Sequence, residues 1–167
     1  MRYAVKIYVA VNQENSGSGD SRSLVANWVQ LLIFLQKYGK LLPEHSGLQL
    51  YPDLWPASSK IFENSPPGAW PHPTERPNFP LPIKCLWTNQ EDDGFWLDKL
   101  NEMTAEIRTF AIEQQCTTAD APIYYNLALD GTPVETIYRE NYSELKPLRR
   151  EVDRNNLMSL TGGFRIV

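Results

Sequence analysis

Residues 21–39 read Ser-Arg-Ser-Leu-Val-Ala-Asn-Trp-Val-Gln-Leu-Leu-Ile-Phe-Leu-Gln-Lys-Tyr-Gly, and this stretch decides the fold of the chain. Large apolar residues recur in it at alternating steps of four and three, at Leu24, Trp28, Leu31, Leu35 and Tyr38. Leu32 widens the stripe, Asp20 or Ser21 can cap its start, and Gly39 can end it. The spacing predicts a long helix with one buried apolar face.

A second stretch, residues 92–110, repeats this pattern. Its apolar positions are Trp96, Leu100, Met103, Ile107 and Phe110, and Asp92 or Asp93 can cap the helix that they predict. Apolar and polar residues alternate with a period of two in residues 3–12, 47–51 and 81–88, and 122–129 also has strand character. These four segments predict four strands.

The predicted order is strand, helix, strand, a long loop, then strand, helix, strand and a helical tail. This order is typical of an α+β, ferredoxin-like fold, in which both helices cover one face of a four-stranded antiparallel sheet. We expect one domain over 1–167, with βαβ halves at 1–51 and 81–129 and a tail at 130–167. Asn141 and Glu144 can form a capping box for a last helix, which Pro147 must kink or delay.

The two halves are joined by residues 52–80, which hold eight prolines. Proline removes a backbone donor and fixes φ, so no helix or central strand is expected there. The segment also carries the aromatic residues Trp55, Phe62, Trp70 and Phe79. We therefore expect an ordered or partly ordered loop that packs on the rest of the chain.

Composition excludes several classes of function. The 167 residues carry a net charge of −4, which gives no basic surface for nucleic acid. Lys6 interrupts any signal-peptide core, and no run approaches the length of a membrane span, so a cytoplasmic protein without membrane contact is expected. Cys85 and Cys116 are expected to be free thiols, and no His or Cys spacing suits a metal.

The last 46 residues carry three groups of motif residues. Tyr124 and Asn126 lie in the first group, Tyr138 and Asn141 in the second, and Gly162-Gly163-Phe164 in the third. Together they resemble the C-terminal tail of the berberine-bridge-like FAD-linked oxidases of the vanillyl-alcohol-oxidase superfamily, with its Tyr-x-Asn-Tyr and Tyr-Gly-x-Asn motifs. The resemblance is specific in this tail, extends less strongly back to Leu81, and is only architectural before that.

The sequence departs from the family pattern at two positions. Leu127 stands where the first motif has its second tyrosine, and Arg139 stands where the second motif has glycine. The family's flavin domain also has no counterpart in these residues. No cofactor is therefore expected. FAD is expected only under the alternative that the chain is a fragment or subunit of a flavin-dependent oxidoreductase that needs a separate flavin domain.

The resemblance implies a substrate domain from secondary metabolism. The first hypothesis is a cofactor-independent enzyme that catalyses a non-redox cyclisation, of Diels-Alder type, or an isomerisation of a polyketide- or terpenoid-like molecule. The alternatives are the flavin-dependent fragment or subunit and a non-catalytic small-molecule-binding or interaction protein. The sheet face opposite the helices must be covered by the proline-rich loop, a second subunit or a ligand. We expect a homodimer with the pocket near or between the two sheets.

Three residues are candidates for catalysis, and five aromatic residues for the substrate pocket. Tyr124, Asn126 and His45 could polarise a carbonyl or move a proton. The candidate pocket residues are Tyr8, Tyr51, Trp55, Trp87 and Tyr125. Each candidate also has a purely structural interpretation, in which the aromatic residues are core, His45 is a solvated loop residue, and Tyr124 and Asn126 only make hydrogen bonds at a strand end.

Overall fold

The computed structural model describes residues 2–7, 21–53, 66, 68–71, 81–121, 123–129, 131–160 and 166. Its strands are β1 (Arg2–Ile7), β2 (Gly47–Pro52) and β3 (Pro82–Trp87). Its α-helices are α1 (Ser21–Gly39), α3 (Asp93–Glu113), α4 (Val134–Tyr138) and α5 (Tyr142–Val152). Short 3-10 helices are η1 (Leu42–Glu44), η2 (Gln90–Asp92), η3 (Tyr125–Leu127), η4 (Arg139–Asn141) and η5 (Leu157–Leu160).

The described strands form one antiparallel sheet in the order β1-β3-β2. Ala4 and Leu50 both pair with Cys85, so β3 is the central strand. The predicted four-stranded ferredoxin-like sheet is therefore wrong for the described part of the chain, which has three strands. The first strand was expected to continue to Asn12, but residues 8–12 lie outside the described part.

The segment expected to be the fourth strand is not a strand. Its described residues, 123–129, contain the 3-10 helix η3, which contacts the edge strand β1. The amides of Leu127 and Ala128 bond to the carbonyls of Tyr124 and Tyr125, at 3.2 and 3.4 Å. Because these backbone groups bond within the segment, they are not available for a ladder with β1.

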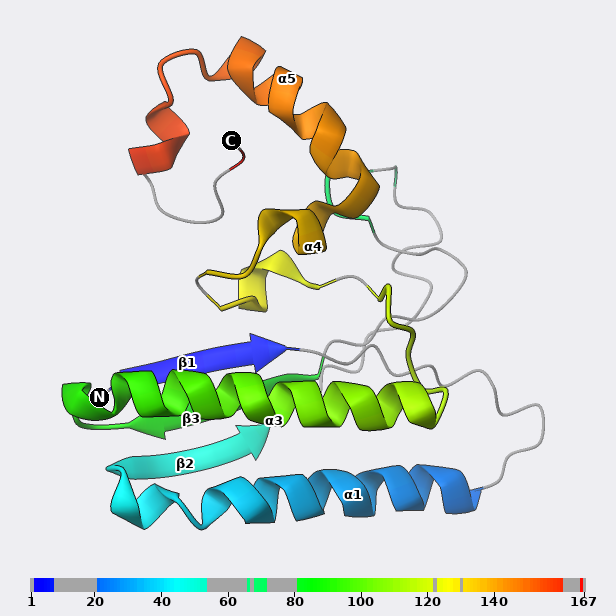
Figure 1. Cartoon of the computed structure of the whole chain (residues 1–167), viewed down its shortest axis with the longest axis vertical. Helices are drawn as coiled ribbons and strands as arrows, with labels where there is room; N and C mark the ends of the chain where they lie inside the picture. Colours follow the sequence, from blue (N-terminus) through cyan, green and yellow to red (C-terminus); the bar gives the residue numbers. More distant parts are fainter. Residues whose placement is uncertain are drawn as a thin grey trace.

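The two long helices pack side by side, as the apolar spacing predicted. Figure 1 shows them antiparallel with nearly aligned axes, with α3 over the sheet and α1 next to β2. Between helices and sheet lies a core that includes Leu31, Tyr38, Ile83, Cys85, Trp87, Trp96, Leu100, Met103 and Ile107. Leu32 was predicted to widen the apolar stripe, but its side chain is 62% exposed. It lies on a neighbouring face of α1, outside this core.

The tail lies beyond the β1 edge of the sheet, where α4 and α5 follow η3 (Figure 1). The predicted capping box is wrong, since Asn141 makes no side-chain cap to α5. Pro147 does not delay the start of the helix either; it lies inside α5. Of the two residues predicted to cap the second long helix, Asp92 makes no side-chain cap to α3, and Asp93 is the first residue of that helix.

Two expectations from composition can be compared with the structure. Cys85 and Cys116 are both free thiols, as predicted. No helix within the described residues has the length and apolar character that crossing a bilayer requires.

Candidate functional site

Four residues form an aromatic and polar cluster beside β1, which we name the tail cluster: Trp70, Tyr124, Tyr125 and Asn126. The rings of Trp70 and Tyr124 meet edge to face with centroids 5.3 Å apart, and those of Tyr124 and Tyr125 lie 5.2 Å apart. The amide nitrogen of Asn126 donates to the Tyr124 hydroxyl at 2.9 Å. Asn126 and Tyr125 are exposed, whereas Tyr124 is half-buried. The cluster therefore presents a phenol and a carboxamide to solvent above packed rings.

Residues 68–71 of the proline-rich segment hold this cluster in place. The Trp70 indole N–H donates to the Ile123 carbonyl at 2.7 Å, directly before Tyr124. Asn141 reaches the same segment from the tail and donates to the carbonyls of Gly68 and Ala69, at 3.1 and 3.2 Å. The expectation that the loop packs through its aromatic residues is confirmed for Trp70. Trp55, Phe62 and Phe79 lie outside the described residues.

Arg139, which contacts the segment just before the cluster, has an unusual backbone. Its φ is 52° and its ψ is −131°, a conformation that glycine adopts easily and that costs other residues about 1–3 kcal/mol. Its Nη2 donates to the Ala121 carbonyl at 2.8 Å, while its Nε is buried without a partner. The position at which the resembled oxidases have glycine is thus one where the backbone here also favours glycine.

Tyr138 adds a further phenol on the tail side. Burial, and to a smaller extent the nearby Tyr125, raise the pKa of the Tyr138 hydroxyl. A raised pKa keeps this phenol protonated at neutral and mildly alkaline pH. Near the tail cluster, Tyr138 is therefore a hydrogen-bond donor and not an anion.

His45 belongs to a different place. Its Nδ1 lies 3.2 Å from Asp92 Oδ1, and its ring stacks on Phe95 at 3.5 Å. The Ser46 hydroxyl donates to the other oxygen of Asp92 at 2.6 Å. This network joins the turn before β2 to the start of α3. Serine and histidine each bind the carboxylate here, whereas a nucleophile-base pair would need them to bind each other.

The three predicted catalytic residues therefore do not form one site. Tyr124 and Asn126 lie beside β1, at one edge of the sheet, whereas His45 precedes β2, at the opposite edge. Neither the sequence spacing nor the motif carried information on this separation. His45 is also not the solvated loop residue of the structural interpretation, because its ring is stacked on Phe95 and bonded to Asp92.

The predicted pocket residues are also divided. Trp87 is 3% exposed and donates its indole N–H to Asp93 at 2.7 Å, so it is a core residue. Tyr51 pairs with Lys84 across the strands, on the sheet face away from the core, and Lys84 forms an ion pair with Asp53. Tyr125 lies in the tail cluster, while Tyr8 and Trp55 lie outside the described residues.

Sequence reasoning did not assign site roles to Trp70 and Arg139. The only signals were an aromatic residue in a proline-rich segment and a cation at a glycine position of the family motif. No group of three metal-ligating side chains occurs in the part of the chain that the structure describes. The chain matches no protein-family model, no curated protein and no solved structure.

Proposed function

We propose that this chain binds a small polycyclic or aromatic natural product at the tail cluster and promotes a non-redox cyclisation or isomerisation of it. The observation that carries the proposal is the convergence of Trp70, Tyr124, Tyr125 and Asn126 into one partly exposed cluster. Aromatic surfaces with a few placed polar groups are the usual anatomy of a small-molecule site. The resemblance of the tail to a substrate domain supports the same class of ligand.

Each residue of the cluster has a distinct part in this proposal. Trp70 and Tyr124 supply rings for a flat ligand to pack against. Tyr125 can donate its hydroxyl hydrogen to a ligand carbonyl, and the carboxamide oxygen of Asn126 can accept from a ligand hydroxyl. Because Asn126 also holds the Tyr124 hydroxyl, its side chain is fixed before the ligand arrives. A bound conformer held in this way reacts faster through orientation alone.

The non-redox form of the proposal is supported by the contacts of Tyr124 and Asn126 and by one departure from the family motif, Arg139. Asn126 donates to the Tyr124 hydroxyl, and the ring of Tyr124 is flanked by Trp70 and Tyr125 from its own chain. Arg139 fills the family's glycine position with a side chain that bonds to Ala121. These described residues do not fit the role of holding a flavin ring, so no step of the proposal uses one.

Binding to a hydroxyanthraquinone, a rigid polyketide-like probe, tests the proposal through quenching of tryptophan fluorescence. Removing one neutral hydrogen bond should weaken binding by about threefold to tenfold, so we expect this loss for Tyr125→Phe and Asn126→Ala. Tyr124→Phe should have a smaller effect, because its hydroxyl mainly positions Asn126.

Asn155→Ala is the matched control, because Asn155 is also exposed and lies outside the cluster. Circular dichroism of each variant separates weaker binding from loss of fold. Equal affinity of Asn126→Ala, Asn155→Ala and the unsubstituted chain would show that the tail cluster is not the site.

A second candidate is a substrate domain of an FAD-linked oxidoreductase, with the flavin held by a domain outside these 167 residues. Exposed apolar side chains in the tail favour it, since such surfaces usually mark interfaces: Leu148, Val152, Leu157, Met158 and Leu160. Co-purification of a yellow flavoprotein, lost on Val152→Glu, would support this candidate. Turnover of a natural product by the colourless chain alone would favour the first.

A further inference from the structure

The Arg139 guanidinium has no acidic partner in the described part of the chain. None of the salt bridges found there includes it. Its one hydrogen bond is to a neutral backbone carbonyl, that of Ala121. A partly buried cation is costly unless a counter-charge or several acceptors compensate it. Among the described residues, the position thus lacks the anion that would normally accompany such a charge.

The backbone at this residue adds an independent observation. Arg139 is held at φ 52° and ψ −131°, where glycine would be free of strain. Residues kept in such regions often serve function, because a purely structural position would favour the unstrained residue. The Nε–H of Arg139 is also buried and has no hydrogen-bond acceptor, so the same residue combines a strained backbone with an unsatisfied donor.

The location connects this cation to the tail cluster. Ala121, which the guanidinium contacts, lies two residues before Ile123, whose carbonyl accepts from Trp70. On the other side, Arg139 directly follows Tyr138, a protonated phenol close to Tyr125. The guanidinium therefore contacts the segment that leads directly into the tail cluster.

We infer that Arg139 is an anion-binding residue of the tail cluster, and that the ligand class is an aromatic or polycyclic molecule bearing a carboxylate. The inference rests on the proposed function of this cluster. The planar guanidinium binds carboxylates through paired N–H donors, which a lysine cannot reproduce. With a net charge of −4, the chain as a whole repels anions, so a preference for one must be local.

The test compares two probes with the same ring system and nearly the same shape, charged 2-naphthoate and neutral 2-naphthamide, by isothermal calorimetry. We expect the unsubstituted chain to prefer naphthoate. Arg139→Gly should remove the preference, a loss of about tenfold or more in naphthoate affinity, with naphthamide nearly unchanged. Arg139→Lys should keep part of it. Arg150→Gln, which removes an exposed charge from α5, should keep all of it.

The stability of Arg139→Gly separates binding from a structural role. Glycine relieves the φ strain, so the thermal midpoint should be unchanged or higher. A lower midpoint with equal losses for both probes would show that Arg139 only anchors Ala121, and would overturn the inference. Equal binding of both probes to the unsubstituted chain would overturn it too and leave the proposed site standing. Binding of neither probe would overturn the inference together with the site.

Discussion

At the scale of single residues, Cys85 shows how burial changes chemistry. Its side chain is fully buried in the central strand, and desolvation raises the pKa of the thiol from 9.0 to about 12. The folded protein therefore keeps the neutral thiol under conditions where the unfolded chain ionises it. Such a thiol is a poor nucleophile at neutral pH, in accord with a structural role.

This pKa shift predicts a loss of stability in alkali. A raised folded-state pKa gives stability that is complete below the unfolded pKa near 9 and is lost as the pH rises toward 12. Between about pH 8 and about pH 10 the thiol should cost about 1 kcal/mol in the free energy of unfolding. Urea titrations of the unsubstituted chain and Cys85→Ala at both pH values measure this. Because Tyr38 also has a raised pKa, only the difference between the two proteins reports on Cys85. Equal pH dependence in both would contradict the assignment.

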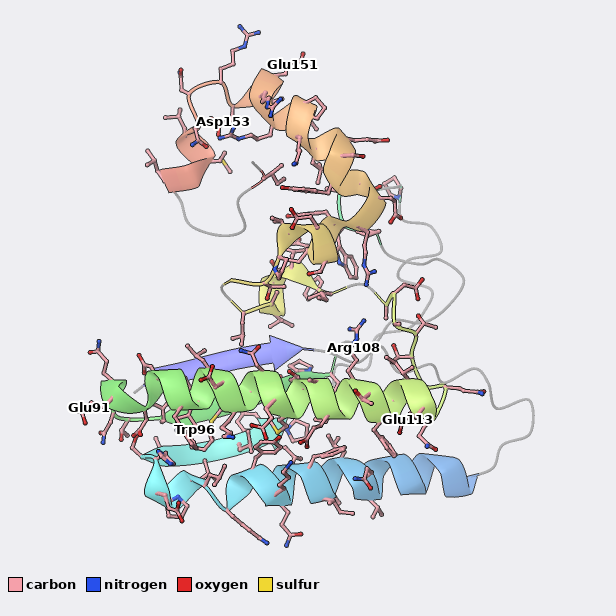
Figure 2. The ribbon with its side chains drawn as sticks, viewed as in Figure 1. Glu91, Trp96, Arg108, Glu113, Glu151 and Asp153 are labelled. Atoms are coloured by element: carbon pink, nitrogen blue, oxygen red, sulfur yellow. The ribbon has the colours of Figure 1, made fainter. Side chains whose placement is uncertain are left out.

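At the scale of elements, hydrogen bonds join the turn between α1 and β2 to the start of α3. Trp96, labelled in Figure 2 at the start of α3, donates its indole N–H to the His45 carbonyl at 2.7 Å. Asp92 accepts from Ser46 in the same turn. His45 was expected to be a catalytic residue, but its network instead fixes the start of α3 against the turn before β2.

Gly47 lies at this junction, where any larger side chain would clash with its neighbours. A methyl group there would lie 2.8 Å from Cζ2 of Trp96 and 2.9 Å from Cα of Leu42. Gly47→Ala should therefore lower the free energy of unfolding by about 1–3 kcal/mol in urea titrations. Gly94→Ala, in the first turn of α3 with open space around it, is the control and should be neutral or stabilising. Similar losses in both variants would mean that close packing at Gly47 is not the cause.

At the scale of the whole molecule, two apolar surfaces are exposed. One is a stripe on α1 at Val29, Leu32 and Ile33, each about half exposed or more. The other is the tail surface along α5 and η5; Glu151 and Asp153, labelled in Figure 2, mark the C-terminal end of α5. Each could be an interface, so the homodimer expected from the sequence stays a prediction.

Sedimentation equilibrium over a range of concentrations tests the homodimer. If α1 forms the interface, Leu32→Glu should shift the chain toward the monomer, because a buried charge opposes association. Ala105→Glu, at an exposed position on α3, adds the same charge away from this stripe and should shift it less. A monomer at all concentrations, with no effect of either change, would show that the dimer prediction is wrong.

The sequence by itself determined the elements whose pattern is local. The alternating steps of three and four residues predicted α1 and α3, and the period of two predicted β2 and β3, because the apolar side of an element is set by its own geometry. The free thiols and the packing of Trp70 were also anticipated from the sequence.

Tertiary structure decided what depends on distant partners. Residues 123–129 have an apolar pattern that suits a strand, but Trp70, about fifty positions earlier, takes the Ile123 carbonyl, and the following amides bond locally. The sheet order placed His45 and Tyr124 by opposite edges, and the turn into η4 set Arg139 in a glycine conformation. Backbone hydrogen bonds and side-chain charges are satisfied by whichever groups the fold brings close, and the spacing of residues along the chain does not specify those groups.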